Sequence, residues 1–290
     1  SGVHAPTALT LCLGDPQARE VDNMYPGHDP SQGDPWHQQG GSDPWTGDTA
    51  WANRAVSLED DLADPVQINR AIDAYRLVVV SEPANPQARW KLLRALHYAV
   101  DFTTLTDDRR QGLLAEAINL ARQTEAILDS VDYGDDDRAR LYFWSAIAFG
   151  SRARRVGPLT IVREGIAARM HKYAKRSRAL DAGVEGGGAQ RLQSRLHASI
   201  PRLPFVSGWV DGSQVLPLAR EAAAIDPEHL GNRLILALAL LDDTDEPPQE
   251  AADLLHGIID AEPQSHRLIE DLIIQRQARA RLDGLDGTTP

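Results

Sequence analysis

The chain has 290 residues and a formal net charge of −12, and 42% of its residues are hydrophobic. The acidic balance argues against a general nucleic-acid-binding protein, and no run of about 18 uncharged apolar residues is present that could cross a membrane. The single cysteine, Cys12, excludes an internal disulfide and any metal site built from several cysteines. The apolar content is sufficient for a packed core.

Residues 1–49 are expected to form an irregular arm, because prolines, glycines and aspartates recur through them. The tripeptide Asp-Pro-Trp occurs twice in this arm, ending at Trp36 and at Trp45, and Trp51 follows. Tryptophan is enriched at protein–protein hot spots, so Trp36, Trp45 and Trp51 are candidates for docking a partner protein. The alternative is that they pack on the first helices and hold the arm against its own domain.

From residue 50 onward, apolar residues recur every three or four positions, which predicts helices. Proline and glycine clusters, notably Gly157-Pro158 and the segment Glu185 to Gly188, separate these helices. We expect one helical domain over residues 50–283 and a frayed tail over residues 284–290. The expected helices cover residues 50–62, 65–80, 87–100, 106–128, 135–156, 159–180, 189–199, 212–225, 228–241, 248–261 and 264–282.

One pattern occurs three times in the helical part. A small or apolar residue is followed after four residues by an apolar one, after three more by another, and after five more by a proline. The copies end at Pro83, Pro227 and Pro263, and the last two prolines are 36 residues apart. This spacing resembles the second helix and stop signal of a tetratricopeptide (TPR) repeat. The sequence therefore predicts an all-α, TPR-like helical-hairpin solenoid of about six helix pairs, preceded by the irregular arm.

The sequence contains no recognisable catalytic motif, so we predict a protein that is not an enzyme and has no cofactor or metal. Gly-x-Ser-x-Gly is absent, and Cys12 has no base nearby in the sequence. The glycines after Glu185 lack the Lys-Ser/Thr and the preceding strand of a phosphate-binding loop, which leaves a flexible turn or a close backbone contact. A metal held in the arm by His28 and His37, with nearby aspartates, is the weaker alternative.

Arginines in the middle of the chain are the best ligand candidates. Basic residues dominate residues 152–178, and Arg191 and Arg195 share one helix face because they are four positions apart. Arginine binds carboxylates through two parallel hydrogen bonds, and nearby aromatic residues would provide an apolar wall. The alternative is that these arginines pair with aspartates of the arm or with solvent-facing aspartates. The candidate ligand-binding residues are Trp144, Arg152, Arg155, Arg163, Arg191, Arg195 and Trp209.

Several short motifs between Leu141 and Ala239 resemble one known family, the TPR-like T component associated with tripartite ATP-independent periplasmic (TRAP) transporters. The eukaryotic regulator of microtubule dynamics proteins share a similar central pattern. The motifs are Leu141-Tyr142-Phe143-Trp144-Ser145-Ala146, Arg163-Glu164-Gly165-Ile166-Ala167, Ala179-Leu180-Asp181, Glu185-Gly186-Gly187-Gly188, Leu196-His197-Ala198, Ala222-Ala223-Ala224-Ile225-Asp226-Pro227 and Asn232-Arg233-Leu234. The tryptophan-bearing arm has no counterpart in that family, and Thr10-Leu11 precedes Cys12 where a lipidated cysteine follows a small residue.

The resemblance implies a periplasmic lipoprotein that forms homotrimers and passes small organic ligands to a substrate-binding subunit. We therefore expect a non-catalytic binding subunit of an extracytoplasmic assembly, holding a small anionic ligand for a TRAP-type transporter. Other protein subunits are its expected partners, and a homo-oligomer is its expected state. The alternative is a scaffold whose arm and concave face dock other protein chains. A pocket lined by Arg191, Arg195 and an aromatic residue would favour the first hypothesis.

Overall fold

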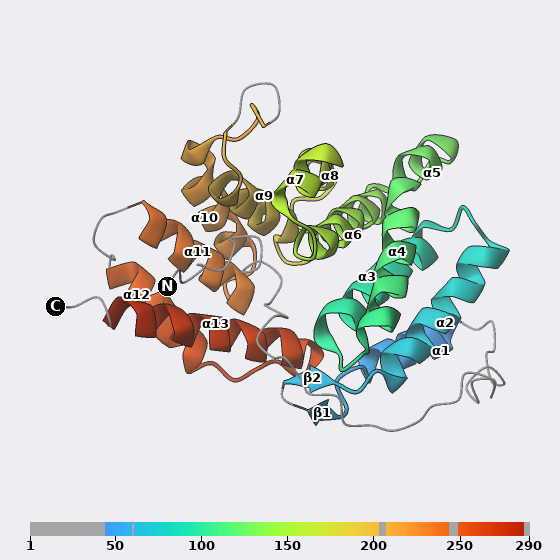
Figure 1. Ribbon diagram of the computed structural model, residues 1–290, viewed down its shortest axis with the longest axis horizontal. Helices are drawn as coiled ribbons and strands as arrows, with labels where there is room; N and C mark the ends of the chain where they lie inside the picture. Colours follow the sequence, from blue (N-terminus) through green and yellow to red (C-terminus); the bar gives the residue numbers. More distant parts are fainter. Residues whose placement is uncertain (1–43, 60, 203–206, 244–248, 287–290) are drawn as a thin grey trace.

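The computed structural model describes residues 44–59, 61–202, 207–243 and 249–286 (Figure 1). Most of these residues lie in helices, and successive helices pack against each other, which confirms the predicted all-α helical-hairpin solenoid. The helices are α1 (Pro44–Ala52), α2 (Val66–Ser81), α3 (Pro86–Phe102), α4 (Asp107–Arg122), α5 (Thr124–Ser130), α6 (Asp135–Ala153), α7 (Pro158–Arg163), α8 (Ile166–Leu180), α9 (Gly188–Ser199), α10 (Val215–Ile225), α11 (Leu230–Asp242), α12 (Gln249–Ile259) and α13 (Leu268–Asp286), with 3-10 turns at Gly212–Gln214 and Ser265–Arg267.

The pattern that occurs three times in the sequence packs as helix pairs. Alanine at its small positions lets two helix backbones approach closely, and burying a larger side chain such as Leu255 contributes about 1.5–3 kcal/mol. Pro83, Pro227 and Pro263 lie just beyond the ends of α2, α10 and α12, because proline cannot continue a helix. The buried positions of the pattern are Ala71, Tyr75, Val78, Ala219, Ala222, Ala251, Leu255 and Ile258.

The N-terminal boundary of the helical part differs from the prediction. Helix α1 begins at Pro44, inside the expected arm, and ends at Ala52 instead of continuing to residue 62. The chain then forms a short antiparallel hairpin of β1 (Leu58–Glu59) and β2 (Leu62–Ala63). Asp61 in its turn has a φ of 66°, a left-handed conformation that an α-helix does not accommodate. The rest of the expected arm lies outside the described residues.

Two segments predicted as continuous helices are each divided in two. The segment 106–128 bends at Gln123 between α4 and α5, and the segment 159–180 is interrupted at Gly165 between α7 and α8. Gly165 has a φ of 62°, which glycine adopts without the steric cost of a Cβ atom. Apolar periodicity continues across such short interruptions, so it did not reveal them. At the other end, α13 continues to Asp286, inside the predicted tail.

Two apolar cores run through the array, and α13 connects them. The larger core includes residues of α1 to α9, and the smaller one includes residues of α10 to α13. Ile269 and Ile273 near the start of α13 belong to the larger core, whereas Ala278 belongs to the smaller one. Helix α13 therefore packs against both halves of the array instead of extending its end.

Polar contacts also join α13 to the N-terminal end. Arg54, just after α1, forms an ion pair with Glu270 (Nη2 to Oε1, 3.2 Å) and donates to the carbonyl oxygen of His266. Arg276 lies 3.4 Å from Asp61 (Nη1 to Oδ2). In Figure 1 the red α13 accordingly begins beside the blue hairpin. Among the described residues, none of the helices combines the length and the apolar character needed to cross a membrane.

Candidate functional site

A cavity of about 730 Å³ lies where α13 faces the array. Residues from α1, α3, α6, α9, α11 and α13 line it, together with the segment just after α1. Arg54 and Glu270, which pair at its edge, are 216 positions apart in the sequence. Small-molecule sites typically enclose about 300–1,000 Å³ behind mostly apolar walls. This cavity has both properties, so it is the candidate functional site.

Aromatic rings form the wall contributed by α1, α3 and α6. The rings of Trp51 and Tyr98 meet edge to face with centroids 5.7 Å apart, and those of Phe143 and Trp144 meet edge to face at 5.1 Å. The indole nitrogen of Trp144 donates to the Glu185 carboxylate (Nε1 to Oε1, 3.1 Å), which fixes the orientation of that ring. This wall presents flat apolar surfaces of fixed orientation to the cavity.

Aliphatic side chains form much of the wall contributed by α9, α11 and α13. Leu192 of α9, Leu234 and Ile235 of α11, and Ile273 of α13 are buried, whereas Ile274 is half-buried. Because these side chains come from three different helices, the wall exists only when α13 is packed in place. The cavity therefore has one aromatic and one largely aliphatic side.

Positive charge exceeds negative charge around the cavity. Its arginines are drawn from both halves of the chain, and its two glutamates come from the turn before α9 and from α13. An excess of guanidinium groups next to apolar walls favours a ligand that is both anionic and partly apolar. The charged lining residues are Arg54, Arg94, Arg191, Arg267, Glu185 and Glu270.

His229 lines the cavity as a neutral ring. Its Nδ1 accepts a hydrogen bond from the backbone N–H of Gly231 at 3.0 Å, so the ring proton is on Nε2. Burial strongly lowers the pKa of His229, and the positive charges of Arg191 and Arg267 lower it further. The ring is therefore uncharged at pH 7, and it caps the start of α11.

Gly186 and Gly187, the two glycines just before α9, position Arg191 at the cavity. Gly186 and Gly187 have φ values of 59° and 82°, and a Cβ atom on Gly187 would lie 3.1 Å from the Cα atom of Ala222. The carbonyl of Gly186 accepts hydrogen bonds from Arg191 (2.8 Å) and from the buried amide of Asn232 (3.0 Å). Of the two structures expected for this run, the close backbone contact is the one observed.

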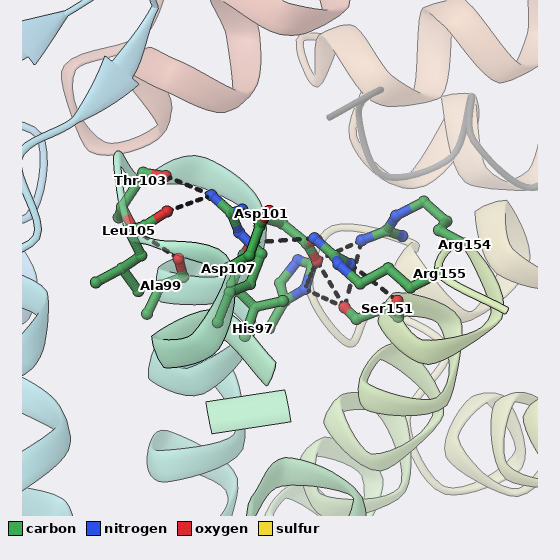
Figure 2. Close-up of polar contacts among 11 residues, drawn as sticks. His97, Ala99, Asp101, Thr103, Leu105, Asp107, Ser151, Arg154 and Arg155 are labelled. Atoms are coloured by element: carbon green, nitrogen blue, oxygen red, sulfur yellow. Dashed lines mark hydrogen bonds and ion pairs between the residues drawn. The ribbon is translucent and has the colours of Figure 1, made fainter. Parts of the chain in front are cut away.

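A buried ion cluster joins α3 to α6 next to the cavity (Figure 2). Asp101, with a side chain only 2% exposed, pairs with Arg154, with Arg155 (Nη2 to Oδ1, 2.7 Å) and with His97 (Nδ1 to Oδ2, 2.8 Å). It also accepts a hydrogen bond from Ser151 at 2.6 Å. Burial by itself raises the pKa of Asp101, but Arg154, His97 and Arg155 outweigh it and hold this pKa well below its usual range.

The same cluster brings a serine, a histidine and an aspartate together, but not in the geometry of a nucleophile relay. In a relay the aspartate binds one ring nitrogen of the histidine and the serine binds the other. Here Ser151 Oγ lies 3.0 Å from Nδ1 of His97, the nitrogen that Asp101 also contacts. Ser151 in addition donates its proton directly to Asp101. The cluster therefore holds α3 against α6 and does not prepare Ser151 for attack.

The structure brings Trp144 and Arg191 to the cavity, but it places the predicted basic residues of α6 and α7 elsewhere. Arg152 binds both carboxylate oxygens of Glu164, at 2.6 and 2.7 Å. Arg155 belongs to the Asp101 cluster, and Arg163 is exposed on α7. Carboxylates thus bind Arg152 and Arg155, but they belong to a glutamate and to a buried aspartate, whereas the alternative named aspartates of the arm or solvent-facing aspartates.

The other two predicted ligand-binding residues also lie outside the cavity lining. Arg195 is buried in α9, four positions from Arg191. Trp209 stacks on His171 with ring centroids 4.2 Å apart. The predicted single basic cleft is therefore not formed by the described residues, because its members belong to separate clusters.

The sequence analysis did not identify Arg94 and Arg54, and it assigned Trp51 to partner docking. In the structure the Trp51 ring lines the cavity and contacts both guanidinium groups, with its centroid 3.9 Å from Cζ of Arg94 and 4.1 Å from Cζ of Arg54. A usable signal was the four-residue spacing of Trp90, Arg94 and Tyr98, which places all three on one face of α3.

Other candidates from the arm fall outside what the structure describes. Trp36, His28 and His37 precede the first described residue, and Trp45 lies in α1 with its side chain undescribed. Comparison with protein-family models finds no matching family, and comparison with curated proteins finds no matching sequence. The geometry of the cavity and the resemblance of the sequence motifs are therefore the features that indicate a function.

Proposed function

We propose that this protein is a non-catalytic binding subunit that holds a small, anionic and partly apolar molecule in the cavity beneath α13. We place it in a periplasmic or otherwise extracytoplasmic assembly of the TRAP-transporter type, as a homo-oligomer in contact with other protein subunits. The cavity of about 730 Å³ is the observation that carries the ligand part. The motifs between Leu141 and Ala239 support the transporter part.

The lining of the cavity supplies the two kinds of interaction that such a ligand requires. Removing a hydrocarbon group from water onto the apolar walls contributes about 25 cal/mol for each Å² of apolar surface buried. The arginines supply charge-assisted hydrogen bonds, which orient an anionic group and discriminate against a neutral one. A ligand with only one of these two properties would leave part of the lining unused.

Two observations count against the rival functions. A scaffold that docks other chains on its concave face needs that face open, whereas α13 of this chain packs against the array and pairs with Arg54 through Glu270. An acyl-transfer enzyme needs an activated nucleophile, whereas Ser151 shares Nδ1 of His97 with Asp101. Both observations leave ligand binding as the better-supported function.

Native mass spectrometry of the full chain, followed by identification of any retained small molecule, tests the ligand part. We expect the wild-type protein to retain an anionic molecule that carries a hydrocarbon portion. The Ile274→Trp variant fills part of the cavity from its half-buried aliphatic wall, and should retain roughly tenfold less. Leu159→Trp on α7 is the matched control, because Leu159 is 80% exposed and outside the cavity lining.

Equal retention in the wild type and in Ile274→Trp would show that the molecule is bound elsewhere. A wild-type protein that retains nothing, or only neutral molecules, would contradict the proposed ligand. The transporter part is tested separately, by whether genes for TRAP membrane subunits lie beside the gene for this chain. Their absence would remove the transporter assignment and leave the cavity hypothesis in place.

A further inference from the structure

The arginines of the cavity differ in what their guanidinium groups already contact. Three of them are engaged by other groups of the protein, which reduces their capacity to bind a ligand. The contacts are Arg54 with the Glu270 carboxylate and the His266 carbonyl, Arg191 with the Asn232 side chain and the carbonyls of Glu185 and Gly186, and Arg267 with the carboxylates of Asp226 (3.7 Å) and Asp271 (3.8 Å).

Arg94 is the exception among them. None of the ion pairs among the described residues includes its guanidinium, whereas Arg54 and Arg267 each pair with a carboxylate. The buried Nε of Arg94 has no hydrogen-bond partner among these residues, and the same is true of the Nε atoms of Arg54 and Arg267. The two carboxylates that act on it electrostatically are bonded to other side chains: Asp48 to Lys91 and Tyr75, and Glu185 to Trp144. Burial lowers the pKa of Arg94, but arginine starts from so high a value that the group stays charged at pH 7.

Aromatic faces surround this charge on the protein side. The Arg94 guanidinium carbon lies 3.9 Å from the ring centroid of Trp51 and 5.0 Å from that of Trp90. Cation–π contacts and a hydrogen bond with the Tyr75 side chain hold the guanidinium in place, and its remaining in-plane N–H groups can donate to a ligand. A sheltered cation without a bonded carboxylate is costly, and a ligand carboxylate would remove that cost.

We infer that Arg94 is the anchor for the ligand's acidic group, and that the ligand is a monocarboxylate with an apolar body. This inference rests on the proposed function and narrows its ligand class. The planar guanidinium matches a carboxylate through two parallel hydrogen bonds, as a neutral head group does not. The hydrocarbon part then lies between the aromatic wall at Trp144 and the aliphatic wall at Leu234 and Ile274.

The remaining charges limit the ligand to one acidic group. Glu185 and Glu270 also face the cavity, and a second carboxylate on the ligand would approach one of them. Arg54 and Arg267 could neutralise it only by giving up their present carboxylate partners. Like charges in a sheltered site repel strongly, so a dicarboxylate should bind less tightly than a monocarboxylate of the same length.

Binding of defined probes to the full chain tests this inference. The probes are octanoate, dodecanoate and 3-phenylpropionate, each compared with its own uncharged amide, and suberate is the dicarboxylate that matches octanoate in length. Isothermal titration calorimetry gives the affinities. We expect the wild type to bind the carboxylates roughly 10- to 100-fold more tightly than the amides, because a charge-assisted bond contributes that much in a sheltered site. Suberate should bind more weakly than octanoate.

Two Arg94 variants and one control test whether Arg94 causes the preference for carboxylates over amides. Arg94→Gln should bind carboxylate and amide equally, while its affinity for the amides stays close to that of the wild type. Arg94→Lys keeps the charge but loses the two-pronged geometry, so it should keep only part of the preference. Arg109→Gln is the matched control, because Arg109 is exposed on α4 and outside the cavity lining. If Arg94→Gln does not fold, the partial loss in Arg94→Lys decides the question.

Each contrary result has a distinct meaning. A wild-type preference for carboxylates that persists undiminished in both Arg94 variants would overturn the role of Arg94 and leave the proposed anionic ligand intact. Equal binding of carboxylates and amides by the wild type would overturn both. A wild type that binds none of the probes would overturn the monocarboxylate class, and the molecule found by native mass spectrometry would then decide the proposed function independently.

Discussion

Arginines at two neighbouring regions around α3 differ in whether a carboxylate of the protein binds them. In the Asp101 cluster, two guanidinium groups, an imidazole and a hydroxyl converge on one carboxylate. At the cavity, the Arg94 guanidinium meets aromatic rings and no bonded carboxylate of the described residues. The partners of Asp101 make the first region a structural joint between α3 and α6. The absence of a bonded carboxylate among the described residues leaves Arg94 with the capacity to bind an anion.

The largest expected effect comes from removing the centre of the Asp101 cluster. Asp101→Ala would leave Arg154 buried without its carboxylate, at a cost of about 3–5 kcal/mol in the free energy of unfolding. Urea denaturation followed by circular dichroism measures this change. Asp101→Asn keeps the shape and part of the hydrogen bonding, and should cost less. A loss below about 1 kcal/mol in Asp101→Ala would show that the cluster is not a structural joint.

The two regions should also respond to acid in different pH windows. His229 at the cavity has a folded pKa below the unfolded value of about 6.5, so the unfolded chain binds more protons as pH falls. The free energy of unfolding therefore decreases below about pH 6.5, by up to ~1.4 kcal/mol per pH unit for this one residue. Asp101 has a depressed folded pKa, so its contribution is complete above about pH 4 and is lost only as pH falls further.

The His229→Asn variant measures how much His229 contributes to the pH dependence of the free energy of unfolding. Asparagine keeps a side-chain acceptor for the N-cap of α11 but does not titrate. Denaturation curves between pH 7 and pH 5 should show a slope that is smaller by about one proton than that of the wild type. His171 and His197 also have lowered pKa values, so they should maintain the rest of the slope in this variant. An unchanged slope would mean that His229 is not a neutral group of the folded state.

Substitution of Arg94 is expected to change stability less than substitution of Asp101, which would distinguish a ligand-binding residue from a structural one. Arg94→Gln removes cation–π contacts, which are individually modest, but it also removes a sheltered charge that has no bonded carboxylate among the described residues. These terms oppose each other, so the free energy of unfolding should change by less than about 1 kcal/mol. Thermal and urea denaturation without ligand measure it. A loss as large as that of Asp101→Ala would make Arg94 a structural residue.

The smallest effect is expected at Arg152, which the sequence analysis placed among the ligand-binding residues. Its partly exposed ion pair with Glu164 contributes about 0–1 kcal/mol. Arg152→Gln should therefore lower the free energy of unfolding by at most that amount and leave octanoate binding unchanged in calorimetry. A weakened affinity in this variant would place the ligand near α6 and α7 instead of in the cavity.

The fold was largely predictable, and the errors have local causes. Helix pairs follow from the three- and four-residue periodicity, and their ends follow from prolines such as Pro83 and Pro263. The helix predicted for residues 50–62 ends at Ala52, and the chain then forms a hairpin whose turn residue, Asp61, has a left-handed conformation that composition does not reveal. Gly165 breaks a helix by the same kind of backbone geometry. Periodicity reports which residues face the core, and it is insensitive to one residue that bends the chain.

The candidate site was predictable only in part. Trp144 and Arg191 were identified because they belong to recognisable motifs, and both line the cavity. Arg155, also predicted to bind the ligand, lies outside the cavity lining, and Asp101, 54 positions earlier, binds it. Arg94 was not identified, and Trp51 was assigned to partner docking, because the cavity wall opposite them comes from α9, α11 and α13. Spacing along one helix predicts which side chains share a face, but it does not predict which carboxylate from a distant segment forms an ion pair with them.

The amino-acid sequence by itself determined an all-helical chain of paired, proline-terminated helices, because burial periodicity and backbone chemistry act over a few neighbouring residues. The tertiary structure alone decided that α13 packs across both cores, that a cavity remains beneath it and that Arg94 faces this cavity without a bonded carboxylate among the described residues. Those outcomes depend on which groups from distant segments meet. Which carboxylate binds each arginine is determined only by the packing of the whole chain.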